Sequence, residues 1–340
     1  IFAEGSRGHL GKRLISRFAL DKDSDPQHYG IGLKELWEVD PSKHEQGVVM
    51  HGLGWPLTET GSTGGWWLYF DENNQVSFGL VADLSYHNPY MSPFDEMQRL
   101  KTHPVIRAVL EGGKRISYGA RALTKGGLNS LPKFTFPGGV LVGDDAGFLN
   151  PAKIKGTHTS MKSGMLAAEA IFEALQADRQ HDEVVAYSTM YKESWLYKDN
   201  YESRNFSPAI HRMGLFMGGA FTFIEHNLLK GKMPLTLHDN APDYDQLERA
   251  DHAYKPTYLK PDGKLIFDKL SSVFISNTNH TEDQPTHLKL TDSTVPISIN
   301  LPLYAEPARL YCPAGVYEVV KDAEGSKFVI NAQNCVHCKT

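Results

Sequence analysis

The sequence predicts a mixed fold, part α/β and part α+β, built from more than one module. An apolar run at residues 140–142 passes through a short loop into apolar residues at helical spacing, which is typical of α/β folds. Residues 29–84 instead alternate with period two, which indicates half-buried antiparallel strands. Near the end of the chain, cysteines flank a stretch with the spacing of a β-hairpin, which indicates a small terminal module.

Length, charge and cysteine content limit the classes of protein that this chain can be. Its 340 residues are enough to bury a large core. The net charge of −5 argues against a nucleic-acid-binding protein, which would present a basic surface. Three cysteines, an odd number, do not form a disulfide framework. No run of about 18 apolar residues occurs, so the sequence predicts no membrane-spanning helix.

The first third of the chain predicts one helix and then an antiparallel sheet. A glycine turn at residues 4–8 precedes apolar residues at helical spacing. The alternating pattern predicts strands, and two short apolar runs predict helices. The expected order is a helix after residue 9, strands at 29–33 and 76–84, helices at 91–100 and 104–110, and a strand at 115–123.

A glycine pair stands inside the alternating region. Gly64 and Gly65 precede the aromatic residues Trp66, Trp67 and Tyr69. Such glycines either form a packing turn or let a flat ring lie against exposed backbone groups. The residues alone leave both possibilities open.

Residues 140–176 predict a ligand site at the end of a strand. Gly143 and Asp144 end the apolar run, and a helix is expected from Ser160 to Gln176. The N-terminus of a helix presents unpaired N–H groups and a positive dipole end, which suit anions and polar ligands. A plain strand-to-helix connection is the alternative.

Later segments predict a helix with an aromatic stripe at 182–205 and irregular structure at 232–307. Between them, residues 213–224 contain no charge. Twelve residues are too few to span a bilayer, which requires about 20. This stretch is therefore either a buried helix or an apolar surface that lies in a membrane interface.

The cysteines at the end of the chain predict a metal centre. Cys312 is followed by proline, and Cys335 and Cys338 form a Cys-x-x-Cys motif. Thiolates are soft ligands that suit iron–sulfur clusters or zinc. Zinc bound by the three cysteines and His337 is the alternative to a cluster. It is geometrically poor, because His337 adjoins Cys338 and is expected to point away.

These motifs resemble two known groups of proteins. Gly143-Asp144 with Gly147, Pro151 and Gly156-Thr157 resembles the second FAD-binding motif of glutathione-reductase-like flavoproteins. The string 153–159 and the cysteine end are similar to the electron transfer flavoprotein–ubiquinone oxidoreductase family. The resemblance implies a glutathione-reductase-like FAD domain at 1–28 and 115–235, an antiparallel-sheet quinone-binding domain at 29–114, and a ferredoxin-like [4Fe–4S] domain at 236–340.

The resemblance also implies site residues, and no catalytic acid or base is among them. Asp144 would hold the ribityl chain of the flavin. The quinone would lie against Gly64 and Gly65. The cluster would be bound by Cys312, Cys335 and Cys338. The full FAD-binding set that the resemblance implies is Glu4, Gly5, Gly143, Asp144, Gly147, Pro151, Gly156 and Thr157.

The implied function is electron transport by an iron–sulfur flavoprotein with the cofactors FAD and [4Fe–4S]. Electrons would pass from reduced electron transfer flavoprotein to ubiquinone. The protein would contact a bacterial or mitochondrial inner membrane peripherally through residues 213–224. Two alternatives are a cluster-free flavin-dependent reductase or hydroxylase of the same fold and a zinc-stabilised interaction protein. Because no Gly-x-Gly-x-x-Gly fingerprint occurs, we expect a fragment whose missing fourth cluster cysteine would follow Thr340.

Overall fold

The structure is a computed structural model that describes residues 1–323 and 325–340. The chain forms two compact units, and each combines two stretches that are far apart in the sequence. The first unit contains Ile1–Tyr29 and Leu123–Pro242, and the second contains Gly30–Ala122 and Asp243–Thr340. The division into three modules that the resemblance implies stays a prediction.

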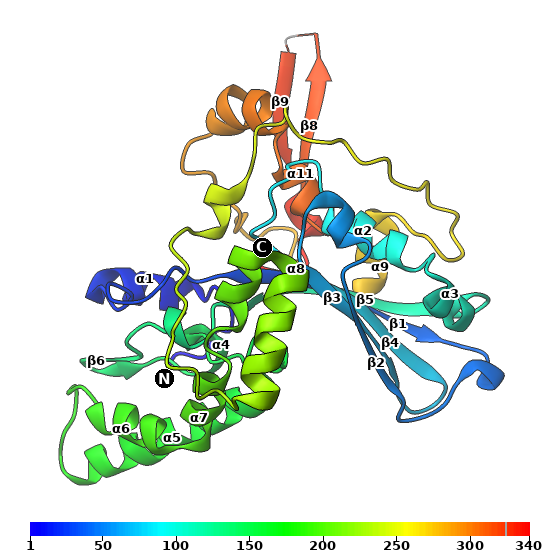
Figure 1. Ribbon diagram of the computed structural model, residues 1–340. Coiled ribbons are helices and arrows are strands. Elements are labelled where there is room, and N and C mark those ends of the chain that lie inside the picture. The colour runs from blue at the N-terminus through cyan, green and yellow to red at the C-terminus, as the bar shows by residue number, and fades with distance from the viewer. Residues whose placement is uncertain (324) are drawn as a thin grey trace. The chain divides into compact units, whose positions relative to one another are not determined.

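A five-stranded sheet is the centre of the second unit (Figure 1). Its strand order is β2-β3-β4-β1-β5. The predicted antiparallel pairing is confirmed, because Leu33 of β1 lies opposite Leu80 of β4. The strands are β1 (Tyr29–Glu38), β2 (Val49–Leu53), β3 (Gly64–Phe70), β4 (Gln75–Asp83) and β5 (Lys114–Thr124).

Helices and a hairpin complete the second unit. The two predicted short helices are present, and each has a proline in its first turn, where the missing N–H costs nothing. The β-hairpin between the cysteines is also present. These elements are α2 (Pro93–Leu100), α3 (Pro104–Leu110), α9 (Lys269–Ser276), α10 (Leu301–Tyr304), α11 (Ala308–Tyr311), β8 (Tyr317–Asp322) and β9 (Gly325–Ile330).

A charged network lies inside the core of the second unit. The Glu35 carboxylate accepts hydrogen bonds from Lys101 Nζ at 3.0 Å and Arg115 Nη1 at 3.0 Å. Burial alone would raise the pKa of Glu35, but the two positive charges hold it below its usual range. Burial lowers the pKa of Lys101 to about 8, against the opposing effect of Glu35. A buried charge is stable only when it is paired, and here the partners come from β1, the end of α2 and β5.

The first unit holds short strands and most of the helices. The strand expected at 140–142 is realised only in part, as β7 (Gly139–Val140), which pairs with β6 (Thr135–Phe136). Phe2 extends the pairing, because its N–H donates to Val140 O at 2.9 Å and its carbonyl accepts from Val142 N at 3.0 Å. The helices begin with α1 (His9–Phe18), α4 (Gly143–Ala146) and α5 (Thr157–Gln176).

The single helix expected at 182–205 is wrong. The chain forms α6 (Val185–Glu193) and α7 (Trp195–Glu202), and Ser194 is extended between them with ψ of 160°. Only half of the aromatic stripe packs in the core as expected, since Trp195 and Tyr201 are 49% and 40% exposed. Tyr187 and Tyr191 are buried against Phe134, with ring centroids 5.0 and 5.2 Å away.

The uncharged stretch 213–224 lies mainly in α8 (Phe206–Phe223). The helix is interrupted at Gly214, whose φ of 72° and ψ of 176° are not helical. A π-helical turn, Ile224–Leu228, follows. Several large apolar side chains of this segment are exposed, among them Phe216 at 86% and Phe223 at 64%. Within residues 1–323 and 325–340, no helix has the length and apolar character that crossing a bilayer requires.

Candidate functional site

A cavity of about 590 Å³ opens in the first unit. Its volume falls in the range of about 300–1,000 Å³ that is usual for small-molecule and cofactor sites. Its wall is formed by the start of α1, the segment before β1 and the loop that contains α4. Charged side chains of both signs line it: Arg7, Lys12, Asp21, Asp25, Asp144 and Asp145.

Local backbone geometry places Asp144 in this wall. Gly143 adopts φ of 59°, a left-handed conformation that favours glycine, and turns the chain from the extended Val142 into α4. The N–H of Gly143 donates to Ser163 Oγ of α5 at 2.9 Å. The Asp144 carboxylate lies beside the N-terminus of α5, because a Cβ added to Gly156 would be 3.5 Å from Asp144 Oδ1.

The predicted FAD-binding residues divide into two groups. Asp144 and Gly147 line the cavity, while Gly143, Gly156 and Thr157 form the adjoining turn and helix start. The other residues have structural contacts. The Glu4 carboxylate accepts the N–H groups of Leu10 and Gly11 at 2.7 and 2.9 Å, so it caps α1. Gly5 turns with φ of 78°, and Pro151 packs 3.2 Å from where a Cβ of Gly127 would lie.

Sequence reasoning missed the positive side of the cavity. Arg7 and Lys12 follow the glycine turn and line the cavity from α1 and its approach. Asp145, which follows Asp144 in the sequence, packs against α1. A Cβ on Gly8 or Gly11 would be 2.3 or 2.2 Å from Asp145 Oδ1, so a larger residue at either position would displace this carboxylate. The basic residues Arg7 and Lys12, which follow Glu4-Gly5 within a few positions, were the sequence signal that could have predicted this positive side.

Gly64 and Gly65 lie at the start of β3, where neighbouring strands approach closely. A Cβ on Gly64 would be 2.1 Å from the carbonyl oxygen of Val81, and one on Gly65 would be 2.7 Å from that of Gly52. Gly64 also has φ of 148°, which few other residues adopt. These contacts give both glycines a packing role in the sheet. Their role in quinone binding stays a prediction.

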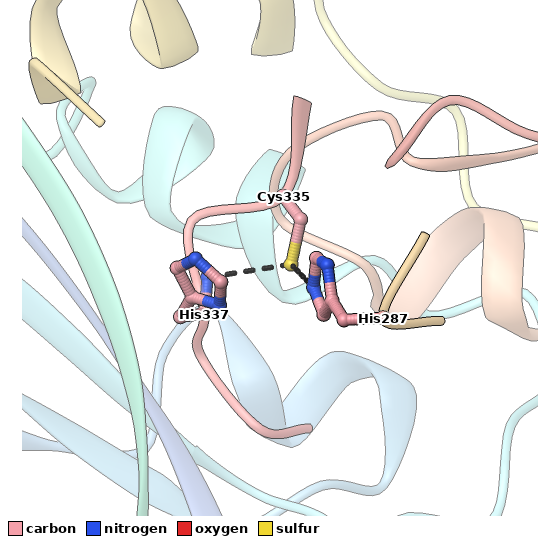
Figure 2. A group of neighbouring side chains, drawn as sticks. All are labelled: His287, Cys335 and His337. Carbon is pink, nitrogen blue, oxygen red and sulfur yellow. Dashed lines mark hydrogen bonds between the residues drawn. The ribbon is translucent and has the colours of Figure 1, made fainter. Parts of the chain in front are cut away.

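The three cysteines gather at the end of the second unit, where each sulfur accepts a hydrogen bond. Cys312, which ends α11, accepts the N–H of Val316 at 3.4 Å. Cys335 Sγ lies 3.4 Å from His287 Nε2 and 3.4 Å from the His337 backbone N (Figure 2). Cys338 accepts the hydroxyl of Thr340 at 3.2 Å. Donors aimed at sulfur favour the thiolate form, which is the form that binds metals.

Electrostatics fit these thiols to a metal centre. Burial raises the pKa of Cys335 and of Cys338. The charges of Cys338 and Cys312 raise the pKa of Cys335 further, and the charge of Cys312 raises that of Cys338. Burial and the same three sulfurs raise the pKa of Tyr317 to about 12. Thiolates that raise one another's pKa in this way repel one another unless a cation neutralises them. The donor set therefore fits a thiolate-bound metal or cluster.

The expectation that His337 points away from the cysteines is wrong. His337 has φ of 54°, and this left-handed turn brings its ring back towards Cys335. His287, Cys335 and His337 have donor atoms within 4.8 Å of one another (Figure 2). His280 stacks on His287 with ring centroids 5.6 Å apart. No sequence signal pointed to His280 or His287, because they lie 55 and 48 residues before Cys335.

Strand β5 holds the cysteine loops in place. The N–H of Ala122 donates to Cys338 O at 2.7 Å, and Arg121 Nη1 donates to His337 O at 3.1 Å. The buried hydroxyl of Tyr118 donates to Pro313 O at 2.9 Å. The loops that carry the cysteines are therefore positioned by the central sheet of the second unit.

Two family profiles match this chain. The profile described as "ETF-QO, ubiquinone-binding" matches residues 29–123. The profile described as "Electron transfer flavoprotein-ubiquinone oxidoreductase, 4Fe-4S" matches residues 263–340. The two matches fall in the sheet and in the cysteine region of the second unit.

Curated relatives match the whole chain. The probable electron transfer flavoprotein-ubiquinone oxidoreductase of Acinetobacter baylyi is 62% identical over 100% of this chain and 63% of its own length. The Pseudomonas aeruginosa protein of that name is 64% identical over 100% of the chain and 62% of its length. The human mitochondrial protein is 49% identical over 100% of the chain and 57% of its own length. The chain spans about three fifths of these relatives and belongs to the electron transfer flavoprotein–ubiquinone oxidoreductase family.

Proposed function

We propose that this chain is part of a peripheral membrane oxidoreductase that passes electrons from reduced electron transfer flavoprotein, through FAD and a [4Fe–4S] cluster, to ubiquinone. One observation carries the proposal. The ubiquinone-binding profile and the 4Fe-4S profile match the two stretches of sequence that fold together as the second unit. A quinone reductase needs its quinone site and an electron-carrying centre at short range, and a shared unit provides this.

In this proposal the cavity of the first unit holds FAD. Asp144 accepts a hydrogen bond from a flavin side-chain hydroxyl, and Arg7 and Lys12 balance phosphate charge. The N-terminus of α5 presents its positive end to the polar edge of the flavin ring. When bound, FAD carries electrons singly or in pairs and the cluster carries them singly, so together they match a one-electron donor to a two-electron acceptor.

Cys312, Cys335 and Cys338 hold the cluster in this proposal. The hydrogen bonds from Val316 N, His287 Nε2 and Thr340 Oγ1 lower the electron density on the sulfurs and so favour the reduced state. The protein supplies no acid–base step of its own here. Its work is to hold the redox centres at fixed positions.

The exposed apolar side chains of α8 and of the turn after it form the membrane contact in this proposal. We call them the α8 patch: Met213, Phe216, Met217, Phe223, Ile224, Leu228 and Leu229. Ubiquinone is insoluble in water, so its reductase must reach into the bilayer surface. A short amphipathic segment of this kind inserts about 5–10 Å into the headgroup region without spanning.

A quinone-reduction assay tests the electron-transfer proposal. The holoprotein is mixed with a short-chain ubiquinone analogue and with either reduced electron transfer flavoprotein or NADPH. We expect rapid loss of quinone absorbance only with the reduced flavoprotein. Reduction by NADPH and none by the flavoprotein would support the cluster-free reductase instead and would refute the proposal.

A flotation assay tests the membrane contact. In the double variant Phe216→Asp with Phe223→Asp, co-flotation with anionic liposomes should fall to background while flavin and iron content stay normal. Phe274→Asp on α9 is the matched control, because Phe274 is also 86% exposed but lies outside the α8 patch. Equal flotation of the double variant and the wild type would remove the α8 patch from the proposal.

A further inference from the structure

A second group of metal-binding side chains lies in the first unit, apart from the cysteines. His28 precedes β1, His211 lies on α8, and Asp239 lies in the segment that follows. His28 and Asp239 are 4% and 8% exposed, and the side chain of His211 is 18% exposed. We propose that these three side chains bind a divalent transition-metal ion of the zinc class. This proposal does not depend on the proposed electron-transfer function.

The geometry matches tetrahedral coordination. His211 Nδ1 is 3.0 Å and His28 Nε2 is 3.4 Å from the same oxygen, Oδ2 of Asp239. Zinc bonds to nitrogen and oxygen are about 2.0–2.1 Å long, which puts neighbouring tetrahedral ligands about 3.3 Å apart. All three donor atoms lie within 4.8 Å of one another. The two imidazole rings are tilted by 57°, so they do not stack face to face.

The charges and ligand types also suit zinc. Two neutral imidazoles and one carboxylate carry a net charge of about −1, which attracts a divalent cation in a buried setting. Imidazole is a ligand for zinc, copper and iron, whereas calcium and magnesium prefer sites built only from oxygen. A set of two imidazoles and a carboxylate leaves one tetrahedral position for water, and His211 is the ligand nearest to solvent.

Hydrogen bonds that need no metal hold the ligands in place. The N–H of Asp239 donates to Asp25 Oδ2 at 3.1 Å. The N–H of Leu237 donates to Asn205 Oδ1 at 2.7 Å, which fixes the segment before Asp239 against the start of α8. The carbonyl of His28 accepts the N–H of Lys125 at 2.7 Å. Such supporting bonds fix ligand orientation at metal sites and reduce the free-energy cost of binding the ion.

The ion would join three distant parts of the chain. It would tie the segment at 24–29, which contributes Asp25 and Gln27 to the cavity wall, to α8 and to residue 239. The cavity wall and the helix that carries the α8 patch would then be fixed to each other within the first unit. A bound metal stabilises the folded state by mass action, since the unfolded chain presents no such site.

Metal analysis of the holoprotein tests the proposal. The holoprotein is used because iron then occupies the cysteine site and the thiols cannot take up zinc. After chelator treatment and addition of zinc, we expect about one zinc ion per chain. X-ray absorption at the zinc edge should show nitrogen and oxygen ligands and no sulfur. Absence of retained zinc, or a sulfur-dominated spectrum, would overturn the proposal even without any variant.

Variants of the proposed ligands provide a second, independent test. Asp239→Asn and His211→Ala should each weaken zinc binding by about 10- to 100-fold or more. Zinc should raise the Tm of the wild type but not of these variants. His181→Asn is the control, because His181 is an exposed histidine of the same unit and asparagine tolerates its φ of 60°. Equal zinc affinity in wild type, Asp239→Asn and His211→Ala would refute the site.

Discussion

The two units use charged side chains for opposite purposes. In the first unit, Arg7, Lys12 and Asp144 line a cavity of about 590 Å³, where a ligand can meet them. In the second, Glu35 and Lys101 are 0% exposed and are paired within the core. The same residue types therefore signal a ligand site in one unit and the fold in the other. The two sets of charged residues differ in whether they line an open cavity or pair with one another inside the core.

The metal site predicted at the three cysteines resembles the charged core of the second unit, because both depend on a few close contacts. A metal bound by the three cysteines would depend on each of a few bonds, whereas a cavity spreads binding over many weak contacts. Single substitutions should therefore have all-or-none effects at the cysteines and graded effects at the cavity. Four predictions test this contrast, from the largest expected effect to the smallest.

Cys335→Ser should remove nearly all bound iron while flavin content stays unchanged. A serine hydroxyl remains protonated near neutral pH and is a poor ligand for the soft irons of a cluster. Iron analysis and the visible spectrum measure the loss. His252→Ala is the control, since His252 is an exposed histidine of the same unit outside the cysteine site. Full iron content in Cys335→Ser would refute its assignment as a ligand.

Lys101→Met should destabilise the second unit by about 3–5 kcal/mol, because it leaves Glu35 buried with one fewer positive partner. Chemical denaturation measures the change. The control is Arg107→Met, which breaks an exposed pair with Glu111 and should cost less than about 1 kcal/mol. Equal effects of the two substitutions would remove the contrast between paired core charges and surface charges.

The stability of the second unit should fall as pH rises from about 4.5 to about 7. Burial raises the pKa of Glu96 to about 7, and its Oε2 has no hydrogen-bond partner among the residues described. Over this range the unfolded state ionises while folded Glu96 keeps its proton, so folding loses about 3 kcal/mol in total. Above pH 7 both states are ionised and the loss is constant.

Glu96→Gln provides the matched measurement. Because glutamine does not ionise, the variant should lack this part of the pH dependence, as seen in denaturation midpoints at several pH values. Tyr258, whose hydroxyl donates to Glu96 Oε1 at 3.0 Å, can still donate to the amide oxygen. Identical pH profiles for the variant and the wild type would show that Glu96 is not the titrating group.

Asp144→Asn should weaken flavin binding by only about tenfold, or about 1.4 kcal/mol, because many contacts share the affinity. Equilibrium titration of the apoprotein with FAD measures it. Asp182→Asn, an exposed carboxyl on the same unit whose side chain is 52% exposed, is the control. Complete loss of binding in a folded Asp144→Asn variant would mean that flavin binding depends on this one carboxylate, as iron binding is expected to depend on each cysteine.

Local patterns predicted the elements well and the contacts between them poorly. Alternation around Leu33 and Leu80 predicted the sheet because period two reflects burial on one face. The turn at Gly143 and Asp144 was predictable because it needs only adjacent residues. The break at Ser194 and the pairing of Lys101 with Glu35 were not predicted, since tertiary packing sets both. His287 reaches Cys335 across 48 residues, a distance that no local pattern encodes.

The bonds from β5 to the cysteine loops mean that the matched segment 263–340 is not a self-contained ferredoxin that could be moved between proteins. Tyr118, Arg121 and Ala122 belong to another stretch of sequence, yet they hold the loops that carry the thiols. Iron is then retained only where the sheet has formed. The brown colour of the purified protein would report on the integrity of strands that contribute no ligand.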